Sequence, residues 1–138
     1  MFQSRIIARG YELDSYGHVN NAVFFNYFEQ ARWELFQKLG LLDELTGKGL
    51  FLVVVEVNLR YQHEIRLGDE VEVTTNVKKD DPFIIFEQRM KIVPGGQAVA
   101  RARVKTVFVD SQRISHDIPR SIEPVFKLNF LGQDGNNR

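Results

Sequence analysis

The spacing of apolar residues predicts one long helix in the first third of the chain. Between residues 22 and 39 apolar side chains recur at steps of three or four, as on one helical face: Phe24, Phe28, Ala31, Leu35 and Leu39. Phe25, Arg32 and Phe36 widen this stripe. Asn20 or Asn21 is a suitable N-cap, and Gly40 stands where a left-handed residue commonly ends a helix.

Most of the remaining chain alternates between apolar and polar residues, which predicts strands. A first strand is expected at residues 3–10, and a second after Gly47-Lys48-Gly49, with one face made of Val53, Val55, Val57, Leu59 and Tyr61. Three further runs lie at 71–77, 83–93 and 97–109, separated by Asp80-Asp81-Pro82 and Pro94-Gly95-Gly96, while Gly68-Asp69 precedes the first of them. Such short links favour antiparallel pairing of successive strands.

A helix this apolar must be covered, and one curled antiparallel sheet wrapped around it would cover it. Ala98, Ala100 and Ala102 would let the last long strand approach the helix closely. The fold class that we expect is α+β. We expect a single domain over residues 1–131, followed by a polar tail over residues 132–138 that is disordered.

Composition narrows the classes of function. The 18 basic and 18 acidic residues cancel, so the chain lacks the basic footprint of a nucleic-acid binder. Because the chain has no cysteine, it has no disulfide and no thiolate nucleophile. No apolar run approaches the roughly 20 residues that span a bilayer, and the N-terminus has no signal-peptide pattern. We therefore expect a cytoplasmic protein without a membrane span.

The loop before the predicted helix concentrates reactive and polar residues, namely Asp14, Tyr16, Gly17, His18, Asn20 and Asn21. It leads into a helix N-terminus, where unpaired amides and a partial positive charge stabilise a developing oxyanion. Asp14 would act there as a nucleophile or general base. Gly17 would let a ligand approach the backbone, and His18 could hydrogen-bond Asp14 or a substrate carbonyl.

The segment Asp14-Ser15-Tyr16-Gly17-His18-Val19-Asn20-Asn21, with Tyr27 and Glu29-Gln30-Ala31-Arg32, resembles the signature of the 4-hydroxybenzoyl-CoA thioesterase-like hotdog family. The resemblance is specific over residues 12–40 and looser over residues 51–110. It implies a hotdog fold, in which five or six antiparallel strands wrap around one helix. It also implies dimers or tetramers with active sites between subunits, and neither a cofactor nor a metal.

The resemblance further implies an acyl-CoA thioesterase that releases a free acid and CoA. Asp14 would carry catalysis, the amide of Asn21 would polarise the thioester carbonyl, and His18 would assist. Tyr16, Gly17 and Asn20 would join Asn21 in substrate binding. An acyl-carrier protein could replace CoA as the carrier, and the plant acyl-carrier thioesterases that resemble this chain have Asn in place of Tyr16.

Charged residues elsewhere allow two interpretations. Arg101 and Arg103 lie on one face of the last long strand, which is either solvated or a clamp for the phosphates of coenzyme A. Glu29 and Arg32, three residues apart on the helix, are expected to form a salt bridge. His63 and His116 are isolated, so we expect no metal site.

Two other functions remain open. An enoyl-thioester hydratase or dehydratase of the same fold also places Asp and His four residues apart, although its motif has an Asn-Pro that this chain lacks. A non-catalytic acyl-CoA binding module is the other alternative, and the intact Asp14 argues against it. The motifs of serine hydrolases, nucleotide hydrolases and dehydrogenases are absent.

Overall fold

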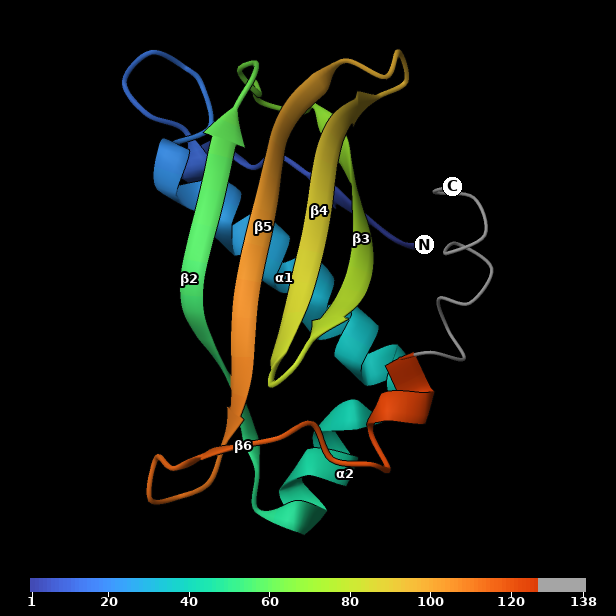
Figure 1. Cartoon of the computed structure of the whole chain (residues 1–138). Helices are drawn as coiled ribbons and strands as arrows, with labels where there is room; N and C mark the ends of the chain where they lie inside the picture. Colours follow the sequence, from blue (N-terminus) through green and yellow to red (C-terminus); the bar gives the residue numbers. More distant parts are fainter. Residues whose placement is uncertain (127–138) are drawn as a thin grey trace.

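One antiparallel sheet with a long helix across one face forms the molecule, and the computed structural model describes residues 1–126 (Figure 1). The strands are β1 (Phe2–Ile7), β2 (Phe51–Tyr61), β3 (Glu70–Asp80), β4 (Phe83–Val93), β5 (Ala98–Val109) and β6 (Ser115–His116). The helices include α1 (Asn21–Leu39) and α2 (Leu41–Lys48), with a short 3-10 turn at Gly10–Glu12. The expected α+β class is confirmed, whereas the tail expected at residues 132–138 lies outside the described residues.

Helix α1 begins and ends where the sequence predicts. Asn20 is the N-cap, and its side chain accepts a hydrogen bond from the amide of Ala22 at 3.0 Å. Gly40 ends the helix in the left-handed conformation, at φ 66°. The predicted stripe is buried at Phe24, Phe28, Ala31 and Leu35. Phe25 was expected to widen this stripe but is 43% exposed, because it shares the outward side of the helix with Trp33.

The sequence pattern did not predict helix α2. It follows α1 directly after Gly40 and ends before Gly49, so its length is eight residues. Leu41 and Leu45 are its only buried residues, and one i,i+4 pair is too short a pattern to reveal a helical period.

The order of the strands in the sheet is β1-β3-β4-β5-β2, with β6 paired to β5. The expected antiparallel pairing of successive strands is confirmed for β3 with β4 and for β4 with β5. It is wrong for β2, which pairs with β5 at the far edge of the sheet. The link over residues 62–69 therefore crosses the end of the sheet between β2 and β3, beside the loop that precedes α1.

Two of the predicted strand faces are partly wrong, because the pairing of β5 with β2 and with β4 is irregular. A bulge between Val54 and Glu56 shifts the alternation of β2, so Val54 and Val57 pair with the inward residues Thr106 and Val104. A second irregularity opposite Met90 and Lys91 leaves Ala98 exposed, while Ala100 and Ala102 are buried against the helix as predicted.

Strand β2 is an apolar edge. Within residues 1–126 no strand pairs with its outer side, and its exposed residues include Val53, Val54, Val55 and Val57. An exposed apolar edge strand is a template for pairing with another chain. In the same part of the chain, no helix combines the length and the apolar character needed to cross a membrane.

Candidate active site

The carboxylate of Asp14 is held by the backbone of its own loop. Its Oδ1 accepts hydrogen bonds from the amides of Tyr16 at 2.9 Å and His18 at 3.2 Å. The amide of Gly17 donates to the carbonyl of Asp14 at 3.1 Å, and Gly17 has a φ of 77°, which favours glycine. Oδ2 accepts no hydrogen bond from residues 1–126. The loop therefore fixes one carboxylate oxygen and leaves the other open.

The ring of His18 pairs with Glu64 rather than with Asp14. Its Nε2 lies 2.5 Å from Oε2 of Glu64, whose other oxygen accepts a hydrogen bond from Arg66 at 3.0 Å. This hydrogen bond from Arg66 lowers the pKa of the Glu64 carboxyl below its ordinary value. An ionised Glu64 only accepts hydrogen bonds, so Nε2 of His18 carries the proton and Nδ1 is free to accept one when the ring is neutral.

The link between β2 and β3 holds the Asp14 loop in place. The amide of Val19 donates to the carbonyl of Ile65 at 2.7 Å, and His18 and Arg66 form a bridge between the two segments. Glu64 and Arg66 belong to this link and so reach the loop although they are distant in sequence. Sequence reasoning missed Glu64 because nothing local distinguishes it from a solvated carboxylate.

The start of α1 is tied to the end of β2. The hydroxyl of Tyr61 donates to the carbonyl of Asn21 at 2.8 Å, and its ring packs edge-on against Phe24, with centroids 5.1 Å apart. Burial raises the pKa of the Tyr61 phenol. Asn21, the first residue of the helix, is exposed, whereas the side chain of Asn20 is engaged as the cap.

Tyr27 anchors the other end of the loop. The hydroxyl of this tyrosine donates to Glu12 at 2.6 Å, and the same carboxylate oxygen accepts a hydrogen bond from the amide of Arg9 at 2.9 Å. Burial and the bond to Glu12 raise the pKa of Tyr27. Tyr27 therefore positions the segment that leads to Asp14.

The salt bridge expected between Glu29 and Arg32 is wrong. Glu29 lies on the outward side of α1 and accepts a hydrogen bond from the indole of Trp33 at 3.3 Å. Arg32 turns toward the sheet and donates to the side chain of Gln88 at 2.9 Å. It is buried, with only 8% of its surface exposed, and this burial lowers the pKa of its guanidinium.

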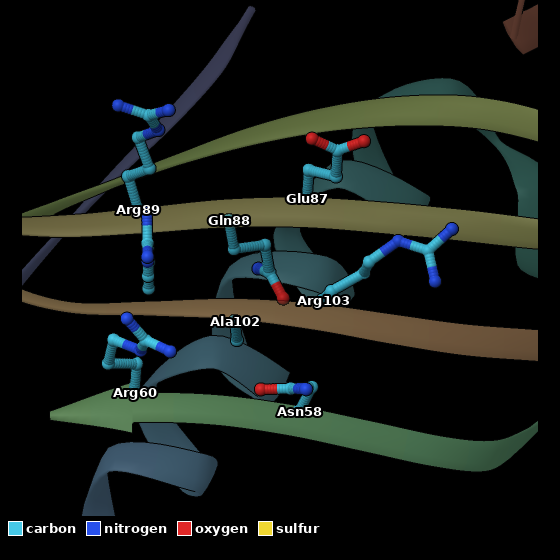
Figure 2. A pocket seen from close by; sticks show the side chains of 8 residues that line it. Asn58, Arg60, Glu87, Gln88, Arg89, Ala102 and Arg103 are labelled. Carbon is cyan, nitrogen blue, oxygen red and sulfur yellow. The ribbon is translucent and has the colours of Figure 1, made fainter.

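Arg101 and Arg103 do not share a pocket with Asp14. They line a cavity of about 320 Å³ on the face of the sheet that points away from α1, together with Asn58, Arg60, Glu87 and Arg89 (Figure 2). We call this cavity the arginine pocket. Asp14, His18 and Asn21 line neither this pocket nor the two hollows beside α1, which include Tyr27 and Trp33 respectively. Across residues 1–126, no three His, Asp or Glu side chains gather closely enough to hold a metal ion.

Comparison with known proteins relates most of the chain to one family. The family model described as the thioesterase-like superfamily matches residues 9–128. The long-chain acyl-CoA thioesterase FadM of Escherichia coli (strain K12) is 33% identical over 109 residues, which are 78% of this chain and 83% of that protein. The acyl-acyl carrier protein thioesterase ATL3 of Arabidopsis thaliana, a chloroplastic protein, is 31% identical over 91% of this chain and 67% of its own length.

A solved structure extends the similarity to the fold. A thioesterase from Thermus thermophilus, complexed with coenzyme A and Zn, has a TM-score of 0.77 and 29% sequence identity. The match covers 91% of this chain and 92% of that one. The helix wrapped in an antiparallel sheet is therefore shared with a known thioesterase.

Proposed function

This chain belongs to the thioesterase-like superfamily, and we propose that it hydrolyses an acyl thioester of coenzyme A to a free acid and CoA at Asp14. It has the hotdog fold and is a thioester hydrolase, as its relatives indicate. The observation that carries the proposed site is the anchored carboxylate, with Oδ1 of Asp14 held by two amides and Oδ2 accepting no hydrogen bond from residues 1–126.

The proposed reaction uses two groups of this loop, the amide of Asn21 and the carboxylate of Asp14. The thioester carbonyl oxygen accepts a hydrogen bond from the amide of Asn21, where the helix dipole stabilises the negative charge that develops. Oδ2 of Asp14 takes a proton from a water whose oxygen bonds to the carbonyl carbon. Alternatively, Oδ2 bonds to that carbon directly, and water then cleaves the resulting anhydride. In both routes the carbon–sulfur bond breaks, its electron pair leaves with the CoA sulfur, and that sulfur takes up a proton.

His18 assists this reaction as a proton carrier. The pairing of Nε2 with Glu64 fixes the orientation of the ring within the same turn as Asp14. Tyr16, Gly17 and Asn20 contribute through the backbone, since the amides of Tyr16 and Gly17 shape the turn and Asn20 caps the helix. The phenol of Tyr16 is 83% exposed, which leaves it available to contact a bound acyl group.

A dimer or tetramer would complete the site. The end of β2 is bonded to the start of α1, and Val54 of its apolar edge lines a hollow together with Trp33 of the same helix. Phe25 adds exposed aromatic surface on this helix. Pairing of β2 with its copy in a second subunit would satisfy the open edge and cover this apolar surface. The acyl chain would then lie between the two subunits.

Replacement of Asp14 by Asn tests the proposed function. The Asp14→Asn variant keeps an Oδ1 acceptor for the two amides but loses the charge, so we expect thiol release from acyl-CoA substrates to fall roughly 100-fold or more. Circular dichroism should show an intact fold. Short, medium, long and aromatic acyl-CoAs should all be assayed, because the acyl preference is open.

Asp110 offers a matched control. Its Oδ1 also accepts amide hydrogen bonds from the second and fourth residues that follow, Gln112 at 2.8 Å and Ile114 at 3.1 Å. Asp110→Asn should therefore perturb a loop of the same kind without lowering turnover. Retention of more than about a tenth of wild-type activity in Asp14→Asn would remove Asp14 from the centre of the mechanism. Tight binding of acyl-CoA by a wild-type protein that hydrolyses none would indicate a binding module instead.

A further inference from the structure

The arginine pocket lies on the face of the sheet opposite to α1. Gln88 donates a hydrogen bond to the carbonyl of Phe28 in α1, so its neighbour Arg89 points to the other face of β4. Figure 2 shows Arg60, Arg89 and Arg103 on neighbouring strands around this hollow. The pocket therefore gathers four arginines from three strands, which are Arg60 of β2, Arg89 of β4, and Arg101 and Arg103 of β5.

The register of the strands places like charges directly opposite one another. Arg101 is opposite Arg60 on one side and opposite Arg89 on the other. Directly opposed residues have Cβ atoms roughly 5 Å apart, and like charges at this separation destabilise a sheet. The fold therefore maintains a row of three guanidinium groups that repel one another unless an anion lies between them.

The carboxylate of Glu87 is opposite Arg103 in the register of β4 and β5 but forms no ion pair with it. Within residues 1–126, Arg60, Arg89, Arg101 and Arg103 form no ion pair and no side-chain hydrogen bond. Glu87 is the one acidic residue of the lining, and it pairs with Lys78 at 2.8 Å. Because the whole chain has equal numbers of acidic and basic residues, the positive charge of the pocket is a local excess.

We propose that the arginine pocket binds the phosphate groups of coenzyme A, and that the enzyme consequently favours acyl-CoA over an acyl-carrier protein as substrate. This inference rests on the proposed thioester hydrolysis at Asp14. Coenzyme A carries a pyrophosphate and a 3′-phosphate, and planar guanidinium forks recognise such oxygens with paired hydrogen bonds. The arm of a carrier protein presents a single phosphodiester that is attached to the protein, so it offers this pocket far less charge.

The position of the pocket fits a ligand that extends from the Asp14 loop. Arg60 immediately precedes Tyr61, the last residue of β2, whose hydroxyl bonds to the carbonyl of Asn21. The arginine row and the start of α1 therefore lie on opposite faces of the same end of β2. A pantetheine arm that passes around this end would join a thioester on one face to phosphates on the other.

Calorimetric titration of the full chain with adenosine 3′,5′-bisphosphate tests the pocket, because this probe carries phosphates and no thioester. We expect Arg101→Ala to weaken binding roughly tenfold or more, since Arg101 is central in the row. Lys105→Ala is the matched control: Lys105 lies on the same face of β5 but outside the pocket lining, over the ring of Phe83. Its loss should weaken binding by less than about twofold.

The preference for acyl-CoA over an acyl-carrier protein thioester gives a second readout. In Arg101→Ala the ratio of kcat/KM for acyl-CoA to that for the matching acyl-carrier protein thioester should fall roughly tenfold. An unchanged ratio would refute the preference. Equal losses of bisphosphate affinity in Arg101→Ala and Lys105→Ala, or no binding by the wild type, would refute the pocket. A changed oligomeric state with unchanged affinity would assign the arginines to a contact between copies, and would also overturn the proposal.

Hydrolysis of an N-acetylcysteamine thioester by the wild type separates this inference from the proposed function, because that substrate has no phosphate. Hydrolysis without bisphosphate binding would overturn the inference alone. Bisphosphate binding without hydrolysis of any thioester would overturn the proposed function and leave a nucleotide-binding protein.

Discussion

Replacement of Gln88 by Leu should destabilise the fold strongly, because Gln88 connects three buried groups. Its Oε1 accepts the bond from Arg32 at 2.9 Å, and its Nε2 donates to the carbonyl of Phe28 at 3.0 Å and to the hydroxyl of Thr75 at 3.1 Å. Leu has a similar volume but none of these bonds. It would leave the Arg32 guanidinium buried without a partner.

The magnitude follows from the kinds of bond that are lost. A bond to a charged group contributes about 1.5–3 kcal/mol and each neutral bond about 1 kcal/mol, so the free energy of unfolding should fall by about 4 kcal/mol. That is a large part of the 5–15 kcal/mol typical of a single domain. Urea denaturation followed by circular dichroism measures the change, and Gln97→Leu is the control because Gln97 is exposed and makes one side-chain bond.

A double variant tests whether Arg32 and Gln88 are energetically coupled. In Arg32→Met/Gln88→Leu no charge is left buried, so we expect the double variant to be more stable than Gln88→Leu alone by about 2 kcal/mol. A double variant whose loss equals the sum of the two single losses would show that Arg32 and Gln88 are not coupled. A loss below about 1 kcal/mol in Gln88→Leu would show that solvent reaches these groups.

Three further predictions concern the site and its surroundings. Tyr61→Phe removes the bond to the Asn21 carbonyl, so it should lower the free energy of unfolding in urea by about 1 kcal/mol and also lower kcat. Tyr11→Phe is the control: it alters an exposed side chain and should change neither quantity. Arg66→Ala removes the bond that lowers the pKa of Glu64, so a carboxyl NMR titration should show this pKa rising toward its ordinary value. The contact between Glu64 and His18 requires an ionised Glu64, and it is lost as the pH falls through the pKa of Glu64. In the variant this contact should therefore be lost at a higher pH than in the wild type. A pKa unchanged by this substitution would contradict the assignment. Val55→Lys places a charge on the open edge of β2, so sedimentation should show a smaller species than the wild type, and an unchanged mass would place the subunit contact elsewhere.

Local patterns in the sequence were sufficient to predict helix α1 and strands β1 to β5, although not the short helix α2. The helix from Asn21 to Leu39 has a regular apolar stripe, a side-chain cap and a terminal glycine, and all three signals lie within the segment itself. Strand β4 matches its predicted range of 83–93, because turn signals flank it on both sides. The partner of β2 could not be predicted in the same way, since the choice between β3 and β5 depends on how the whole sheet closes around the helix.

Contacts between distant segments also limited the prediction of the site. The motif around Asp14 located the loop, and the structure adds that backbone amides hold its carboxylate. The pairing of His18 with Glu64 depends on a link that passes the loop only in the folded chain. Glu29 and Arg32 have the spacing of a helical ion pair, yet the two side chains point to different surroundings, one to solvent and one to the sheet.

The way in which the loop holds Asp14 has a consequence for how this enzyme can diversify. Oδ1 is bound by main-chain amides, which every residue except proline supplies, so the side chains at positions 15 and 16 are not needed to keep the carboxylate in place. Natural or laboratory variation at these two positions can therefore retune substrate choice while catalysis persists. A library randomised at Ser15 and Tyr16, with proline omitted, offers a direct route to enzymes with new acyl preferences.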